Sequence, residues 1–443
     1  MEPILHIVHA IDTEGPLDED ILATFDRLKQ LFDVDLEPSR ETLSKLQKQE
    51  IALGEGLEER VAQVVAPSLL NYNRSWPQIQ SMLDEAMSQE FRRQMVDDFD
   101  NGWVYSWHCV DHMGYASNPR HKDMGYGNVF RYYRQIIDET KSIHDELNWH
   151  FHPLSITKNP LSAATSYNNA IDLITKIWCQ RIVEDQWFPT TNRPGFHSER
   201  SDANLFLEQW LPFDYANQSI EEQNSGQNDT LFGRFGDWSR APQNWLGYHP
   251  SLHDYQSEGD LRRWIFRCLN VGTRFRNLTR KHLQEAFTDA NEHGSAILAF
   301  ADHDYRDLRK DVNQFRELLS EVRGHYPNVK IKFNGAHAAA MEHIKTRPNV
   351  PLSPTKPAFT ASVCENRLFV EMTSGELIGS QPFLALRSKS GEYYHDNFDI
   401  LSVNKRWTYI FDEQTISLDS LDKIGVGAAG RYGHYHVEVL DGG

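Results

Sequence analysis

Hydrophobic positions along the first 346 residues follow two periods, one typical of buried strands and one typical of amphipathic helices. The run Ile4–Ile11 is mostly apolar and stops at a Gly-Pro turn, which predicts a buried parallel strand. Residues from about 17 to 101 are charged and helical in pattern, so we expect a long helical insertion before the next strand. Further strands are predicted over residues 103–110, 147–153, 213–216, 296–301 and 330–333.

Helical spacing separates these predicted strands. It predicts helices over residues 129–137, 201–211, 263–290, 312–322 and 337–344. We expect Ser201 and Asp202 to cap the second of these helices, and residues 217–259, rich in Asn, Gln, Gly and Ser, to form loops. Alternating strands and helices indicate an α/β fold with a parallel sheet, either open or closed into a barrel.

The pattern changes after residue 346. Residues 347–357 contain four prolines and no periodicity, as a linker does. Short alternating runs separated by Gly, Asn and Asp turns then predict a small all-β domain over residues 358–443. We therefore expect a barrel-like domain over residues 1–346, a linker and a β-rich domain.

Composition excludes several classes of function. The net charge of −18 and the lack of a basic run argue against nucleic acid and anionic membranes as partners. Four cysteines lie far apart and form no C-x-x-C pair, so a disulfide scaffold or a thiolate zinc site is not expected. Residues 1–15 do not resemble a signal peptide, and we expect a cytoplasmic protein. The oligomeric state stays open.

Two carboxylates, Asp12 and Glu14, follow the first predicted strand. Polar residues at strand ends of parallel α/β folds converge in active sites, because the loops there meet. One carboxylate can ligate a metal while the other takes a proton from a nearby water. The alternative is a turn that uses acidic residues as caps.

Strict alternation over residues 147–153 places His150 and His152 on one strand face. Neutral imidazoles at this spacing can bind one divalent cation together with Glu14, leaving positions open for water and substrate. We expect zinc, with cobalt and nickel as alternatives. The competing interpretation is a pair of ordinary core or surface histidines.

Other candidates lie at strand ends and in loops. His303 follows the predicted strand 296–301 between Asp302 and Asp304, and it is a candidate general acid oriented by a neighbouring carboxylate. Residues 193–197 are predicted to form a proline-glycine turn, in which Arg193 could pair with Asp12 and the Phe196 N–H could stabilise an oxyanion. The alternatives are a hydrogen-bonded, inert histidine at the strand end for His303, and a loop with an ordinary arginine for Arg193. The remaining substrate-site candidates are His197, Asp111, Tyr248 and His249.

In this order, the motifs resemble those of the NodB-like polysaccharide deacetylases, carbohydrate esterase family four. The matching stretches are Asp12–Gly15, Trp149–Pro153, Arg193–His197 and Leu298–His303. The acidic pair is similar to the Asp-x-Glu variant of the family. The spacing of the histidines departs from the usual i, i+4, and the helical insertion is not typical.

The resemblance implies a distorted (β/α)-barrel of about seven strands. It also implies that Asp12 is the base, tethered by Arg193, and that His303 is the acid. Glu14, His150 and His152 would hold the metal. The expected function is N-deacetylation of a carbohydrate, an amino sugar or glycan precursor, including a nucleotide-linked amino sugar. The alternatives are a catalytically degenerate carbohydrate-binding or glycan-assembly protein, and a metal-dependent hydrolase of another amide or ester.

Overall fold

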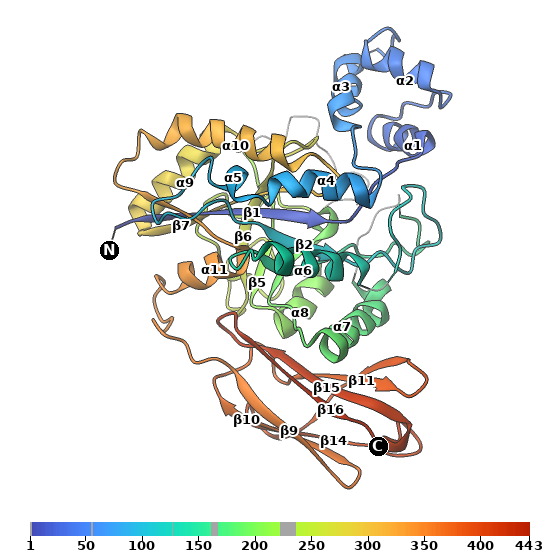
Figure 1. The fold of residues 1–443 in the computed structure, drawn as a ribbon, viewed down its shortest axis with the longest axis vertical. Helices are drawn as coiled ribbons and strands as arrows, with labels where there is room; N and C mark the ends of the chain where they lie inside the picture. Colours follow the sequence, from blue (N-terminus) through green and yellow to red (C-terminus); the bar gives the residue numbers. More distant parts are fainter. Residues whose placement is uncertain (1, 55, 126, 161–166, 222–235) are drawn as a thin grey trace.

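A closed parallel barrel forms the centre of the protein (Figure 1). The computed structural model describes residues 2–54, 56–125, 127–160, 167–221 and 236–443. Seven strands follow one another in chain order around the barrel, and the seventh pairs with the first. They are β1 (Ile4–Thr13), β2 (Ser106–Val110), β3 (Glu146–Phe151), β4 (Thr191–Pro194), β5 (Phe213–Asn217), β6 (Trp264–Asn270) and β7 (Ser295–His303).

Strand β1 has three neighbours. Its residues Ile4–Ile7 pair with β8 (Lys330–Phe333), whereas Ala10–Thr13 pair with β2. The barrel therefore closes on the carboxyl half of β1, the half that leads to the two acidic residues.

Helices surround the barrel and bury its outer face. Trp107, Leu298, Phe300 and Ile331 on the strands pack with Phe315 and other helix residues in one large core cluster. The helices are α4 (Trp76–Ala86), α5 (Gln89–Arg92), α6 (Asn128–Thr140), α7 (Ile171–Asp185), α8 (Ser201–Trp210), α9 (Arg280–His293), α10 (Leu308–Arg323) and α11 (Ala336–Ile344). Within the described ranges, no helix is both long and apolar enough to cross a membrane.

The first part of the insertion forms a small lobe. It consists of α1 (Ile21–Phe32), α2 (Arg40–Gln47) and α3 (Leu57–Val64), and Figure 1 shows it beyond the carboxyl end of β1. The lobe has a core of its own, in which Phe25 and Leu28 pack with Leu46 and Val61. Helices α4 and α5 then return to the barrel.

The C-terminal part is all β. Two four-stranded antiparallel sheets have the orders β13-β14-β10-β9 and β12-β11-β15-β16. Helix α7 packs on β11 and β15, and the absence of a side chain at Gly427 lets Ile182 and Phe188 approach that sheet. The strands are β9 (Ala358–Cys364), β10 (Arg367–Ser374), β11 (Phe383–Ser388), β12 (Tyr393–Asp396), β13 (Asp399–Ser402), β14 (Arg406–Ile410), β15 (Leu421–Ala429) and β16 (Tyr435–Asp441).

Three local predictions are wrong. The range 263–290, predicted to be helical, begins with strand β6, and α9 starts only at Arg280. A short apolar run such as 264–269 does not distinguish strand from helix by periodicity. Arg193 and Pro194, predicted as a turn, end strand β4. Ser201 is the first residue of α8, and Arg200 takes the N-cap position without a side-chain bond. Part of the predicted loop, residues 222–235, lies outside the described residues.

Candidate metal centre

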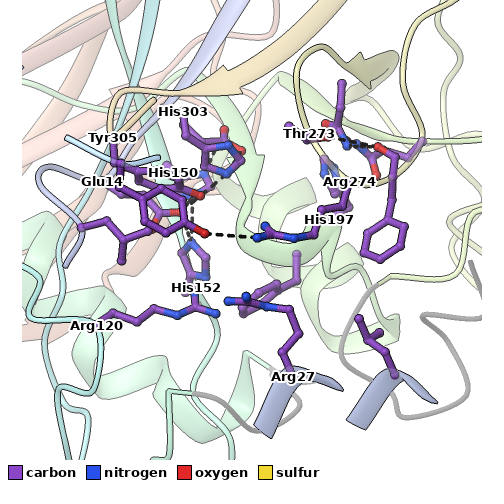
Figure 2. A pocket seen from close by; sticks show the side chains of 18 residues that line it. Glu14, Arg27, Arg120, His150, His152, His197, Thr273, Arg274, His303 and Tyr305 are labelled. Carbon is purple, nitrogen blue, oxygen red and sulfur yellow. Dashed lines mark hydrogen bonds and ion pairs between the residues drawn. The ribbon is translucent and has the colours of Figure 1, made fainter. Parts of the chain in front are cut away.

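The barrel brings the predicted strand-end residues together (Figure 2). Asp12 on β1 lies in register with His303 on β7, and Glu14 follows just beyond the end of β1. His150 on β3 and His152 just past its end line the same cavity. Convergence of segments almost 300 residues apart follows from the closure of the parallel sheet.

Glu14, His150 and His152 could hold a metal ion. One ligand atom from each lies within 4.8 Å of the others. The two Nε2 atoms are 3.0 Å apart, and Oε1 of Glu14 lies 3.1 Å from His152 Nε2 and 3.9 Å from His150 Nε2. Ligand atoms around tetrahedral zinc, bound at roughly 2.0–2.1 Å, are separated by about 3.3 Å. The three atoms therefore have the spacing that a small divalent cation requires.

The ring of His150 is oriented for ligation. Its Nδ1 lies 2.6 Å from the backbone oxygen of Arg193, so this nitrogen donates and leaves the Nε2 lone pair directed at Glu14 and His152. A hydrogen bond of this kind commonly sets the tautomer of a metal-binding histidine. Burial, and then the neighbouring His152, lower the pKa of His150 well below its usual value, which keeps the ring neutral as metal binding needs.

Asp12 lies beside this group and is held by Arg193. The Arg193 Nε donates to Asp12 Oδ1 at 2.6 Å, and the guanidinium is fully buried. A second guanidinium nitrogen donates to the backbone oxygen of Tyr215. The other carboxylate oxygen, Oδ2, faces Nε2 of His303 at 3.8 Å. Asp12 is thus a charge-paired carboxylate between the candidate metal ligands and a histidine.

His303 faces both carboxylates and stacks on Tyr305, with ring centroids 4.7 Å apart. Burial lowers the pKa of His303 well below its usual value, and Lys122 and Arg193 lower it further, so the ring is neutral at pH 7. The flanking carboxylates do not orient it. Asp302 lies 3.1 Å from Nε2 of His9, and Asp304 points back to the β1 turn.

Sequence reasoning missed two residues that support Glu14. Asp304 accepts the backbone N–H groups of Glu14 and Gly15, each at 2.8 Å, and the hydroxyl of Tyr133 at 2.9 Å. Lys122 forms an ion pair with Glu14 Oε2, and burial lowers the pKa of Lys122 to about 7. Asp304 could have been found by its strand-end position, but Lys122 lies in a loop with no pattern to mark it.

A cavity of about 150 Å³ opens over these residues. Phe196 and His197, both expected at the substrate site, line it. The Phe196 ring stands edge-on against His152, with centroids 4.8 Å apart, and His197 contacts the Arg193 guanidinium at 3.3 Å. Other lining residues come from the helical insertion and from loops after β2, β6 and β7: Leu17, Arg27, Leu31, Tyr72, Arg120, Arg274 and Tyr305.

Three expected substrate-site residues lie outside the lining of this cavity. Asp111 pairs with Arg181, whose guanidinium donates to it at 2.8 Å. Tyr248 donates its hydroxyl to the backbone oxygen of Tyr255, and His249 packs on Trp264 beside a separate cavity. Their polar groups serve local structure.

Comparisons of this chain with protein-family models, with curated proteins and with solved structures find no match. We therefore interpret the site from its own geometry.

Removing a ligand should weaken metal binding. We expect the wild-type protein to bind one equivalent of Zn²⁺. Loss of a residue that only supports a metal ligand typically lowers metal affinity by roughly 10–100-fold, so His150→Ala and His152→Ala, which remove ligands, should each lower the Zn²⁺ affinity by more than this. Isothermal titration calorimetry with Zn²⁺ measures this, with His249→Ala as the control outside the cavity. Unchanged affinity in His152→Ala would show that His152 is not a ligand.

Gly195 tests the geometry without removing a ligand. A Cβ at residue 195 would overlap the imidazole of His152. Gly195→Ala should therefore displace this ring and lower the Zn²⁺ affinity by roughly 10–100-fold, as loss of a supporting contact does. Gly324→Ala is the matched control, because a Cβ there meets open space. Equal affinities of the two variants would contradict the placement of His152.

Proposed function

We propose that this protein is a metal-dependent hydrolase, specifically an N-deacetylase of an amino sugar or glycan precursor. The observation that carries the proposal is the position of Asp12, between the Glu14–His150–His152 group and His303. The resemblance of the same residues to the Asp-x-Glu branch of the NodB-like deacetylases supports the acetamido group as the target.

A divalent cation on Glu14, His150 and His152, zinc being our first choice, would acidify water and polarise the acyl carbonyl. The open side of the three ligands faces the cavity, where substrate has access. The remaining steps belong to residues of the chain.

Asp12 acts as the general base. The buried Arg193 holds its Oδ1 by a hydrogen bond of 2.6 Å, and the carboxylate can accept a proton from water as the water oxygen attacks the acyl carbon. Phe196 lines the cavity beside His152, and its backbone N–H is our candidate donor to the oxyanion that develops on the acyl oxygen.

His303 acts as the general acid after it has received a proton. Because its ring is neutral at rest, it has no spare proton to give before the reaction begins. Oδ2 of Asp12 lies 3.8 Å from His303 Nε2, so the proton that Asp12 takes from water has a short path to the imidazole. His303 then protonates the leaving nitrogen, the C–N bond breaks, and acetate and a free amine result.

Acetate release tests the proposal. With Zn²⁺ or Co²⁺ present, the wild-type protein should release acetate from at least one member of a panel of N-acetyl sugars. Asp12→Asn should lower kcat by ~10²–10⁴-fold, the usual contribution of a general base, while Zn²⁺ affinity changes much less. The exposed Asp138→Asn on α6 is the control and should match the wild type.

Two outcomes would replace the deacetylase assignment. Cleavage of ester substrates or of other amides, with no acetate from the sugars, would assign the site to a different hydrolase. Carbohydrate binding by the zinc-loaded protein without any turnover would identify a binding or assembly protein on the same scaffold.

A further inference from the structure

Three arginines line the cavity that also contains the candidate metal ligands. Arg27 comes from α1, Arg120 from the loop after β2, and Arg274 from the loop after β6. Figure 2 shows the Arg27 and Arg120 side chains reaching toward each other below His152, with Arg274 on the far side of the cavity. Three separate segments therefore contribute guanidinium groups to the wall of one cavity.

The charges of this group are not balanced among the described residues. Arg27 and Arg120 share one carboxylate, Glu19, which pairs with Arg27 and lies 3.2 Å from Arg120 Nε. Arg274 donates to uncharged acceptors, the Val64 backbone oxygen at 2.8 Å and the Tyr72 hydroxyl at 3.2 Å. Three guanidinium groups and one carboxylate leave an excess of two positive charges.

The acidic residues of the cavity do not cancel this excess. Asp12 is paired with Arg193, and Glu14 is paired with Lys122. A cation bound at Glu14 would add further positive charge. The cavity is thus positive although the chain as a whole carries a net charge of −18.

One nitrogen of the Arg27 guanidinium points to a ligand. This atom, Nη1, is buried and has no hydrogen-bond partner in the part of the chain that the structure describes. The Arg27 side chain is 9% exposed, and Arg27 lines the cavity. Buried polar groups in native proteins are nearly always paired, so this unpaired nitrogen leaves the Arg27 guanidinium with hydrogen-bonding capacity that an anion in the adjoining cavity can use.

Charge repulsion within the cluster acts on Arg274. Burial lowers the pKa of Arg274, and repulsion from Arg27 lowers it further. Burial alone would raise the pKa of Glu19, yet Arg27 and Arg120 bring it down to about 2. A single carboxylate held so strongly in its ionised form does not offset three cations, and a bound anion would relieve the remaining repulsion.

We propose that Arg27, Arg120 and Arg274 form a binding site for a phosphate group carried by the substrate. The proposal deepens the proposed function, since it makes the substrate a phosphorylated or nucleotide-linked amino sugar whose acyl group reaches the metal centre. A phosphate monoester carries about −1.5 to −2 charges at pH 7, which matches the excess of two. A carboxylate would leave one charge unbalanced, and guanidinium groups bind phosphate oxygens in pairs.

Phosphate-containing probes that cannot be deacetylated test the site apart from catalysis. Inorganic phosphate, glucose 1-phosphate and UDP-glucose lack an acetamido group, so their affinities do not depend on deacetylation. We expect calorimetry to detect binding of at least one phosphate probe to the zinc-loaded wild type. Arg27→Met and Arg274→Met should each weaken it at least about tenfold, because each removes a charged hydrogen bond.

Two controls distinguish phosphate binding at the arginines from binding elsewhere on the protein. Lys29→Met removes an exposed positive charge from the same helix as Arg27 and should keep wild-type affinity. His150→Ala removes a candidate metal ligand and should keep most phosphate binding. Binding that is lost in His150→Ala and kept in Arg27→Met would place the phosphate on the metal and overturn the proposal.

Three further outcomes decide the ligand. Absence of binding of all three probes at millimolar concentration overturns the proposal, and acetate binding as tightly as phosphate replaces phosphate by a carboxylate. Glucose 1-phosphate and UDP-glucose distinguish a monoester from a nucleoside diphosphate.

Arg27→Lys keeps the charge but loses the paired geometry, so an intermediate affinity supports the arginine site even where Arg27→Met does not fold.

Discussion

The buried ion pair between Arg193 and Asp12 is the interaction on which the site depends. The guanidinium holds Asp12 on β1, while the backbone oxygen of the same residue fixes the ring of His150 on β3. One residue of β4 thus sets the positions of the proposed base and of a candidate metal ligand. Without the guanidinium, Asp12 would be an uncompensated buried charge, a situation that typically costs about 3–5 kcal/mol.

Much of the candidate metal centre could be predicted from local pattern. The apolar run that ends at Asp12, the alternation around His150 and the apolar strand before His303 all mark carboxyl ends of parallel strands, and such ends meet at one rim of a barrel. The α/β barrel and the antiparallel C-terminal sheets follow from the same periodicities. Strand β6 was missed because its short, mostly buried apolar run, interrupted only by Arg267, does not distinguish a strand from a helix by periodicity.

The supporting and lining residues could not be predicted in this way. Lys122, Arg120 and Arg274 lie in loops, where neither period applies, and their partners are set by tertiary folding alone. Tyr248 and His249 lie outside the lining of this cavity, and their residue type in a loop gave no information about that position. The net charge did not predict this cavity either, because a total of −18 for the whole chain does not show how charge is distributed around one positive cavity.

The lobe formed by α1, α2 and α3 packs around its own core, apart from the barrel core that supports Asp12 and His150. It nevertheless contributes Arg27 and Leu31 to the cavity wall. The cavity wall therefore combines residues of two hydrophobic cores. Substitutions within the lobe can therefore change the shape and charge of this wall while the packing around Asp12 and His150 stays the same.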